Sequence, residues 1–327
     1  MSVSPHPLTT VQELLCCPVC KAKLQREGAE YACTNPACGR HFPLVHGVPI
    51  LVNEANSLLS IDSFVTAKTP EETKQEPKIQ QVVERLLPNI SHNVKARQNY
   101  AQLMRLLLER TPTPTVLVIG GGEIGAGMDA LLTHPAITVV ETDVYLSPRT
   151  GLICDAHDIP FAPEAFDAVV VQAVLEHVVD PYRCVEEIHR VLKQDGLVYA
   201  EIPFMQQVHM AQFDFTRFTH LGLRRLFRHF AEISSGAVGG PGMALAWSYQ
   251  YFLLSFAKRR YVRALLRIFG SLTSFYLKYF DYYLIDKPGT FDAASGYYFL
   301  GQKTDLVLSD HALITLYRGA QERQTLV

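Results

Sequence analysis

Hydrophobic and polar positions alternate in two ways along the middle of this 327-residue chain. NYAQLMRLLLER (99–110) repeats its apolar residues at i, i+3 and i+4, which predicts a helix. VLVI (116–119), AITVV (136–140), FDAVVVQ (166–172) and GLVYAEIPF (196–204) are short apolar runs, which predict strands. Strand and helix patterns follow one another in a fixed order. We therefore expect an α/β domain with a Rossmann-like sheet and helices on both faces.

The segments around this domain are less regular. AKTPEETKQEPKIQ (67–80) is polar and cannot bury much apolar surface, so it reads as a linker. QQVVERLLP (80–88) has helical spacing. SGYYFLGQK (295–303) and TDLVLSD (304–310) look like late strands that complete the sheet.

A glycine-rich turn follows the first predicted strand. In VLVIGGGEIGAG (116–127), Gly120, Gly122 and Gly125 fit the pattern GxGxxG. The first glycine allows a tight turn, the second lets backbone approach a ligand, and the third lets helix and strand pack closely. Asp143, about 20 residues further on, stands where an acidic side chain meets a ribose hydroxyl pair. The pattern predicts a nucleotide-binding turn, although similar glycines also close ordinary strand–helix units.

Five ordered motifs between residue 115 and about residue 230 resemble the class I S-adenosylmethionine (SAM)-dependent methyltransferases. They are the glycine turn, Asp143, Asp155-Ala156 followed by IPF, the strand FDAVVVQAVLEHV, and VLKQDG at the place of a Lys-Pro-Gly-Gly turn. Val118 departs from this pattern, because the family often has an acidic residue there, and Asp195 replaces a glycine. The resemblance implies that SAM is bound by Gly120, Gly122, Gly125, Asp143, Asp155, Ala156 and Gln172. Asp155 would read adenine, or it would cap a helix.

Candidate acceptor-side residues follow two later strands. His209, Asp214 and Arg217 lie close to aromatic residues in the segment MQQVHMAQFDFTRF. The segment resembles a pattern in a bacterial subgroup of these methyltransferases. We expect His209 to act as general base and Asp214 to orient it. Asp214 and Arg217 could equally form an ion pair that fixes the loop. His177, beside Glu176 in VLEHV, is the third candidate, with a structural role as the alternative.

Five of the seven cysteines lie between residues 16 and 38. Cys17 and Cys20 form a CxxC pair, and Cys33 and Cys38 form a wider second pair. Two such pairs around a short hairpin can place four thiolates on one zinc ion, with Cys16 as an alternative to Cys17. A disulfide is disfavoured in a reducing compartment. The segment, including HFPLVHGVPILV, resembles the small zinc-ribbon proteins that accompany methyltransferases, which implies a structural zinc.

Beyond residue 240 the chain becomes apolar, aromatic and basic. Residues 221–270 carry eight Lys or Arg and one acid, and Arg259, Arg263 and Arg267 recur every four residues. The pattern suits peripheral membrane contact through 243–285, a lid or a homodimer helix. No apolar run is long enough for a membrane span, and the first residues lack a signal-peptide pattern. We expect a cytoplasmic protein, peripheral at the inner membrane face.

Together these patterns predict three regions. They are a zinc ribbon (1–55), a linker with N-terminal helices (56–110), and a methyltransferase domain (111–327) with a basic, apolar helical insertion at about 221–285. The expected reaction is methyl transfer from SAM to an O or N nucleophile of a small-molecule, saccharide or lipid-linked acceptor. RNA methylation is the first alternative, disfavoured by a net charge of −2 and a non-basic ribbon. A non-catalytic partner protein with the same fold is the second.

Overall fold

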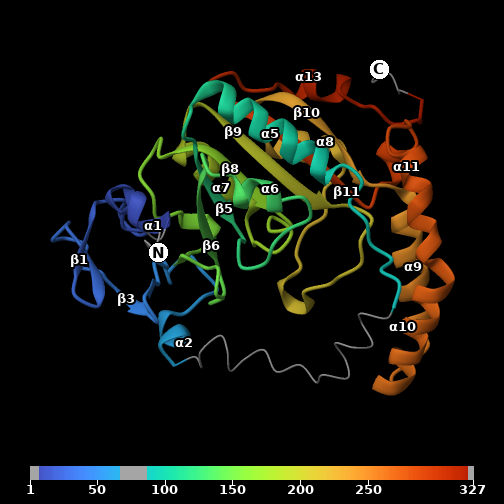
Figure 1. The fold of residues 1–327 in the computed structure, drawn as a ribbon, viewed down its shortest axis with the longest axis horizontal. Helices are drawn as coiled ribbons and strands as arrows, with labels where there is room; N and C mark the ends of the chain where they lie inside the picture. The colour runs from blue at the N-terminus through green and yellow to red at the C-terminus, as the bar shows by residue number, and fades with distance from the viewer. Residues whose placement is uncertain (1–6, 67–86, 323–327) are drawn as a thin grey trace.

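The computed structural model describes residues 7–66 and 87–322. Its centre is a seven-stranded sheet with the order β10-β11-β9-β8-β5-β6-β7 (Figure 1). The strands are β5 (Thr115–Ile119), β6 (Thr138–Asp143), β7 (Leu152–Ile153), β8 (Phe166–Gln172), β9 (Leu192–Pro203), β10 (Phe230–Gly239) and β11 (Gly296–Lys303). The predicted α/β fold is thus confirmed.

Strand direction brings the loops of interest to one edge of the sheet. Neighbouring strands from β7 to β9 pair in parallel, whereas β11 runs antiparallel to both β9 and β10. The carboxyl ends of β5, β6, β8 and β9 therefore lie along one edge, called here the carboxyl edge. Open α/β sheets bind their ligands in the crevice outside this edge.

Apolar residues of β5 alternate between two cores, one on each face of the sheet. Val116 and Val118 pack with Leu103 of α5 (Ala96–Arg110). Leu117 and Ile119 pack with residues of α7 (Pro181–Val191) and α8 (His220–Leu226). Burial on both faces explains why the strand sequence is apolar without interruption. Val118, which departs from the family pattern, belongs to the α5 core.

The N-terminal segment forms a small antiparallel sheet in the order β1-β2-β3-β4. Its strands are β1 (Leu24–Glu27), β2 (Glu30–Cys33), β3 (His41–Val45) and β4 (Val48–Pro49), after α1 (Pro7–Thr10) and the 3-10 helix η1 (Gln12–Leu14). It sits beside the β7 edge, where Ile50 bridges Ile153 in parallel and Leu51 donates its backbone N–H to the Ile153 carbonyl at 2.9 Å. The predicted ribbon is confirmed as a β-rich unit.

One hydrophobic core joins this ribbon to the seven-stranded sheet. Leu15 and Phe42 of the ribbon belong to the same buried cluster as Phe161 and Phe166. Leu15 forms a β-bridge with Phe161, and Lys21 makes an ion pair with Glu187 at 2.8 Å. The ribbon is therefore packed as part of the larger fold. Our sequence prediction treated residues 1–55 as a separate domain and did not anticipate this shared core.

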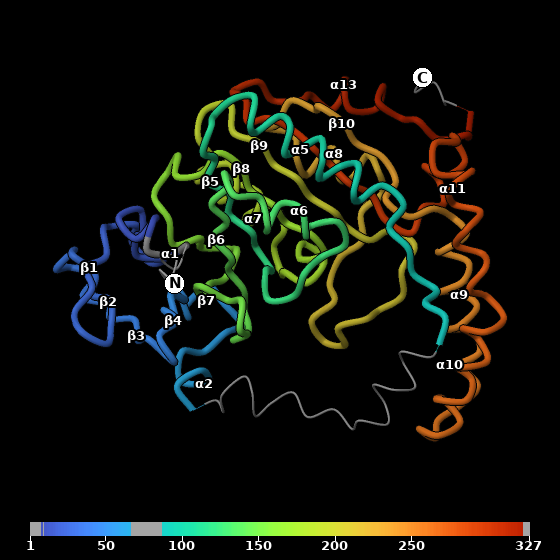
Figure 2. The backbone as a smooth tube through the Cα atoms, viewed as in Figure 1, coloured from blue at the N-terminus to red at the C-terminus, as the bar shows by residue number. Residues whose placement is uncertain are grey.

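The helical insertion lies between β10 and β11, at the opposite end of the sheet from the ribbon (Figures 1 and 2). It consists of α9 (Pro241–Ser255), α10 (Arg260–Ser274), η4 (Phe275–Phe280), α11 (Asp281–Leu284) and α12 (Thr290–Ala293). Residues 221–240, expected within it, instead complete α8 and form strand β10. The remaining short elements are α2 (Ile61–Val65), α6 (Asp129–Thr133), η2 (Ala156–Asp158), η3 (Ala211–Phe213) and α13 (Asp310–Thr315).

Three other expectations can be compared with the elements. The helix expected at 99–110 is α5, and SGYYFLGQK forms β11. TDLVLSD is not a strand: β11 ends at Lys303 and already pairs on both sides, and 304–309 run without regular structure toward α13. The whole of the expected linker (67–80) and most of the expected helix at 80–88 lie outside the described residues.

Helix α10 turns an apolar stripe toward solvent. Tyr261, Leu265, Phe269 and Leu272 lie on one side of the helix, and each is at least half exposed. We call these four residues the outer stripe. The opposite side is buried through Gly270, Ser271 and Ser274, and a Cβ on Gly270 would meet Gln250 of α9 at 3.2 Å. Small and polar residues therefore lie where α10 is most buried and closest to α9, and the outer stripe lies on the other side.

Candidate metal centre and active site

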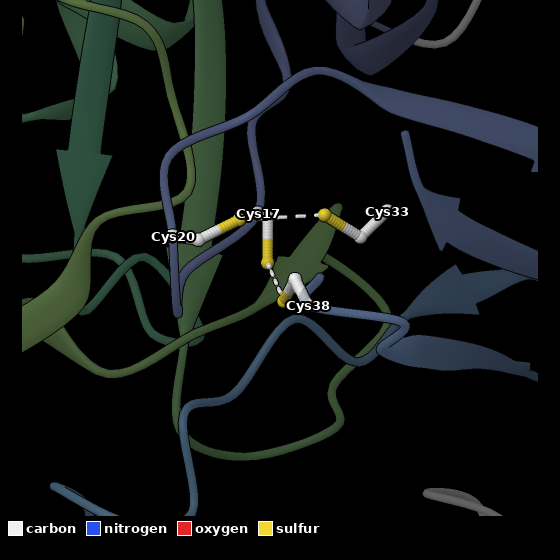
Figure 3. A group of neighbouring side chains, drawn as sticks. All are labelled: Cys17, Cys20, Cys33 and Cys38. Carbon is white, nitrogen blue, oxygen red and sulfur yellow. Dashed lines mark hydrogen bonds between the residues drawn. The ribbon is translucent and has the colours of Figure 1, made fainter. Parts of the chain in front are cut away.

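Four cysteine side chains converge at the ribbon's first turns (Figure 3). The Sγ atoms of Cys17 and Cys38 are 3.8 Å apart, and those of Cys20 and Cys33 are 3.4 Å apart. Tetrahedral zinc with Zn–S bonds of about 2.3 Å requires sulfur–sulfur separations of about 3.8 Å. All seven cysteines are free thiols, which agrees with metal ligation rather than a disulfide. The four predicted ligands can hold a structural zinc.

The choice of Cys17 over Cys16 has a clear basis. The Sγ atom of Cys17 lies within 4.8 Å of those of Cys20, Cys33 and Cys38, and Cys16 does not belong to this group. The backbone N–H of Cys16 donates to the carbonyl of Pro160 at 3.0 Å. Burial raises the pKa of the Cys17 thiol to about 12, whereas a hydrogen bond with the backbone at Ala22 lowers that of Cys20 to about 7. A bound metal deprotonates such thiols and so couples its binding to folding.

The glycine turn sits at the carboxyl end of β5. Gly120 has φ +78°, a left-handed conformation that favours glycine, and its N–H donates to the Thr142 carbonyl at 2.9 Å. A Cβ on Gly122 would lie 2.7 Å from Oδ2 of Asp143, and a Cβ on Gly125 would lie 1.9 Å from Oε1 of Gln172. The tight turn expected at Gly120 is present, and the backbone of Gly122 and Gly125 is approached by the Asp143 and Gln172 side chains; the contacts of the three glycines with a cofactor stay predictions. The glycine turn therefore has the small residues that a close approach of SAM to the backbone requires.

Asp143 closes the end of β6 against the glycine turn. Its Oδ2 accepts from the Gly122 N–H at 2.7 Å, and its Oδ1 accepts from the N–H groups of Val144 and Tyr145. Burial raises the pKa of this carboxyl group above its usual value. Asp143 thus lies at the position from which a ribose could be bound. Its role as a SAM ligand stays a prediction.

Asp155 and Ala156 begin η2 at the end of β7. The Asp155 carboxylate accepts from the backbone N–H of His157 at 3.0 Å, and it also bonds the His157 ring and the Ser57 hydroxyl. Burial opposes its ionisation, but these hydrogen bonds keep its pKa below the usual value. The capping role that we weighed for Asp155 is therefore present in the structure. Adenine recognition by Asp155 and Ala156 stays a prediction.

Gln172 belongs to a buried polar network that the sequence analysis missed. Its Nε2 donates to Oε2 of Glu201 at 2.8 Å, and its Oε1 accepts from the Tyr100 hydroxyl at 2.9 Å. Glu201 also accepts from Asn93 and from Tyr199, and burial raises its pKa to about 7. An acidic residue inside the apolar run VYAEIPF was the available signal for Glu201. This network fixes the carboxyl ends of β8 and β9 beside the glycine turn.

The acceptor-side candidates come together on two loops of the carboxyl edge. Glu176 and His177 follow β8, and His209 and Asp214 follow β9. The ring centroids of His177 and His209 are 4.7 Å apart, and Nδ1 of His209 lies 3.2 Å from Oδ2 of Asp214. Arg217 pairs with both oxygens of Asp214. The orienting contact and the ion pair that we weighed as alternatives therefore coexist.

The pKa values of Asp214, His209 and Glu176 are shifted in different directions. The hydrogen bonds from Arg217 lower the pKa of Asp214 to about 2. Burial, together with the neighbouring His177, lowers the pKa of His209. Glu176 is fully buried, and burial raises its pKa to about 8. At neutral pH His209 is thus an unprotonated imidazole beside a permanent carboxylate, as a general base requires. The catalytic assignments of His177, His209 and Asp214 stay predictions.

The sheet order and the glycine turn define a Rossmann-like fold of the class I methyltransferase type. Residues 124–200 match the family model described as a methyltransferase domain, which confirms the resemblance and SAM as the cofactor of this domain. The matched part runs from the glycine turn into β9. No curated protein sequence matches the chain.

Solved structures offer only distant likenesses. A chain of the complex between the Haloferax volcanii Trm112 methyltransferase activator and a putative methyltransferase is 18% identical (64% of this chain, 92% of that chain, TM-score 0.36). A putative sarcosine dimethylglycine methyltransferase from Galdieria sulphuraria is 14% identical (73% and 92%, TM-score 0.40). Phosphoethanolamine N-methyltransferase 2 of Haemonchus contortus with SAM is 14% identical (86% and 71%, TM-score 0.41). These likenesses decide neither acceptor nor partner.

Proposed function

We propose that this chain transfers the methyl group of SAM to an oxygen or nitrogen nucleophile of a small-molecule, saccharide or lipid-linked acceptor. One observation carries the proposal: the glycine turn, Asp143 and the His177–His209 pair all lie on the carboxyl edge of one sheet. The matched methyltransferase domain includes β8 and the loop with His177. A cofactor held at β5 and β6 would present its methyl group toward the loops after β8 and β9.

The chain's own residues would divide the work as follows. The glycine turn and Asp143 hold the cofactor, and His209, positioned by Asp214, accepts the proton of the nucleophile. The nucleophile bonds to the methyl carbon as the carbon–sulfur bond breaks, and S-adenosylhomocysteine leaves. Positioning can supply roughly 7 to 11 kcal/mol of such a barrier. General base catalysis contributes a smaller factor, about 10² to 10⁴ in rate.

Titration calorimetry with SAM and S-adenosylhomocysteine tests the cofactor site. We expect micromolar binding to the zinc-loaded protein and at least tenfold weaker binding to Asp143→Ala, because the ribose loses its acceptor. Asp310→Ala, which removes an exposed carboxylate on α13, is the matched control and should bind as the wild type does. Equal affinity of Asp143→Ala and wild type would remove Asp143 from the site. No binding to any form would favour the non-catalytic partner protein.

We further propose that the insertion rests on an anionic membrane surface at the cytoplasmic face. The outer stripe of α10 is apolar and aromatic, and Phe252 and Phe256 of the α9 end are also exposed. Residues 241–280 contain six Lys or Arg and no Asp or Glu. Lys278 is buried, the other five are exposed, and Arg263 also donates to the Leu254 and Ala257 carbonyls. An interfacial helix has this combination of an apolar face and cationic flanks. Within the described residues, no helix is long and apolar enough to cross a bilayer.

Vesicle flotation distinguishes a membrane from a second copy of the chain. We expect the wild type to float with phosphatidylglycerol-containing vesicles. A triple variant with Leu265→Ser, Phe269→Ser and Leu272→Ser should remain in the vesicle-free fraction. Leu306→Ser, an equally apolar and exposed position outside the insertion, is the control. If vesicles capture neither protein while the wild type is dimeric and the triple variant monomeric, the stripe is a homodimer surface instead.

A further inference from the structure

Three metal-binding side chains face one another at the carboxyl edge, far from the ribbon cysteines in the sequence. Nε2 of His177 lies 3.8 Å from Oε1 of Glu176, and Nε2 of His209 lies 3.9 Å from the same oxygen. These separations are too long for hydrogen bonds, so no direct bond explains the grouping. The ligand atoms of the three residues all lie within 4.8 Å of one another.

The imidazole rings of His177 and His209 are each held through contacts at Nδ1. Nδ1 of His177 lies 2.7 Å from the carbonyl oxygen of Phe213, which can only accept, so this nitrogen carries the proton. Nδ1 of His209 lies 3.2 Å from the Asp214 carboxylate, and it also accepts a hydrogen bond from the Arg217 guanidinium at 3.4 Å. Nε2 is the ring nitrogen that each histidine brings near Glu176. Metal-binding histidines are held by such partners on the other ring nitrogen.

Glu176 supplies a second, independent observation. Its side chain is fully buried, and among the described residues neither of its carboxylate oxygens has a hydrogen-bond partner. An unpaired buried carboxyl group costs free energy, because it has lost its water without gaining donors. The backbone carbonyl of Glu176 accepts from Phe215 at 2.8 Å, which holds the two loops together around the side chain. A cation between the three residues would supply the missing partner.

We propose that Glu176, His177 and His209 bind a divalent transition-metal ion. Three atoms with these separations share a point no more than about 2.8 Å from each (4.8 Å divided by √3). Metal–nitrogen and metal–oxygen bonds of about 2.0 to 2.2 Å then need less than 1 Å of closure. Two histidines and one carboxylate leave coordination positions open, unlike the closed four-cysteine site. His177 and His209 are partly exposed, whereas Glu176 is buried beneath them.

The site would define the acceptor class, a point that rests on the proposed methyl transfer. A cation with open positions binds an acceptor that offers oxygen ligands, such as two neighbouring hydroxyls of a saccharide. Coordination lowers the pKa of the bound hydroxyl, whose proton passes to water. That oxygen then attacks the methyl carbon as the carbon–sulfur bond breaks. In the metal-bound protein His209 is a ligand, and it accepts the proton only in the metal-free form.

Manganese binding tests the site without any need for activity. Mn²⁺ prefers carboxylate and imidazole over thiolate ligands, so a ribbon already filled with zinc should not compete. We expect the electron paramagnetic resonance signal of free Mn²⁺ to fall on titration of the full-length, zinc-loaded protein. Glu176→Gln, which keeps the shape, and His209→Ala, on a surface loop, should each weaken binding at least tenfold. His311→Ala, an exposed histidine of α13, should bind as the wild type does.

Zinc analysis and circular dichroism complete the experiment. Protein exposed to excess zinc and then desalted should retain a second zinc per chain beyond that of the ribbon, and His209→Ala should lose it while keeping its fold. Mn²⁺ binding unchanged by Glu176→Gln and His209→Ala would overturn the site. SAM calorimetry on the same samples separates the two proposals. Metal binding without SAM binding refutes only the methyl transfer. SAM binding without metal binding refutes only the metal site.

Discussion

Truncation of Leu15 tests whether the ribbon and the methyltransferase sheet unfold together. Leu15 is 2% exposed, bridges Phe161 and belongs to the core cluster that continues into the sheet. A buried Leu→Ala change costs about 2 to 5 kcal/mol, and we take about 3 kcal/mol for this well-packed position. Unfolding entropy is about 2.1 cal/mol/K per residue, or roughly 0.7 kcal/mol/K for a chain of this length. Leu15→Ala should therefore lower the Tm of the whole protein by about 4 °C.

Differential scanning calorimetry of the zinc-loaded protein provides the assay. We expect one endotherm that moves as a unit in Leu15→Ala. Val19→Ala removes an exposed side chain between Cys17 and Cys20 of the ribbon and should shift the endotherm by less than about 1 °C. Two endotherms, with only the lower one displaced by Leu15→Ala, would refute the argument, because the ribbon would then fold on its own core.

Three further changes test separate parts of the fold. Cys33→Ser should abolish the ribbon's zinc, measured by plasma mass spectrometry, and lower the Tm of the same single transition; retained zinc would contradict the four-cysteine site. Burial lowers the pKa of His220 to about 4, against an ordinary 6.5, so the unfolded chain protonates first as pH falls. The free energy of unfolding should thus drop by up to about 3 kcal/mol between pH 6.5 and 4, and His220→Gln should flatten that drop in urea titrations. Gly125→Ala would force the Gln172 side chain aside and should cost about 1 to 3 kcal/mol, whereas adding Gln172→Ala should cost much less than the two changes summed separately.

Local patterns in the sequence predicted the local features of the molecule. The glycine turn after β5, the helix α5 and the four-cysteine group each depend on residues close together in the chain, where spacing decides the outcome. The turn expected at VLKQDG is instead the irregular start of β9: the pairing with β8 shifts register between Leu192 and Leu197, and Asp195 adopts φ +61°, which Asp tolerates better than most residues do.

Contacts between distant segments could not be predicted in this way. Nothing in the spacing of Ser57 indicates that it bonds Asp155, and the bridge between Leu15 and Phe161 joins residues far apart in the sequence. Helix α10 shows the same limit. Its sequence reveals an apolar face and a basic face, but not which one meets α9; Gly270 and Ser274 decide this by allowing close approach on the side away from the outer stripe.

Because the ribbon and the sheet share a core within one chain, their assembly does not depend on a second protein. A ribbon on a separate chain would have to find its catalytic partner, and the fraction assembled would follow the abundance of both proteins. Covalent linkage replaces that encounter with an effective concentration of the order of millimolar, so even a weak contact is nearly always formed. The assembled fraction is then independent of expression level. Zinc availability, rather than the stoichiometry of two gene products, would set how much of this protein is properly assembled.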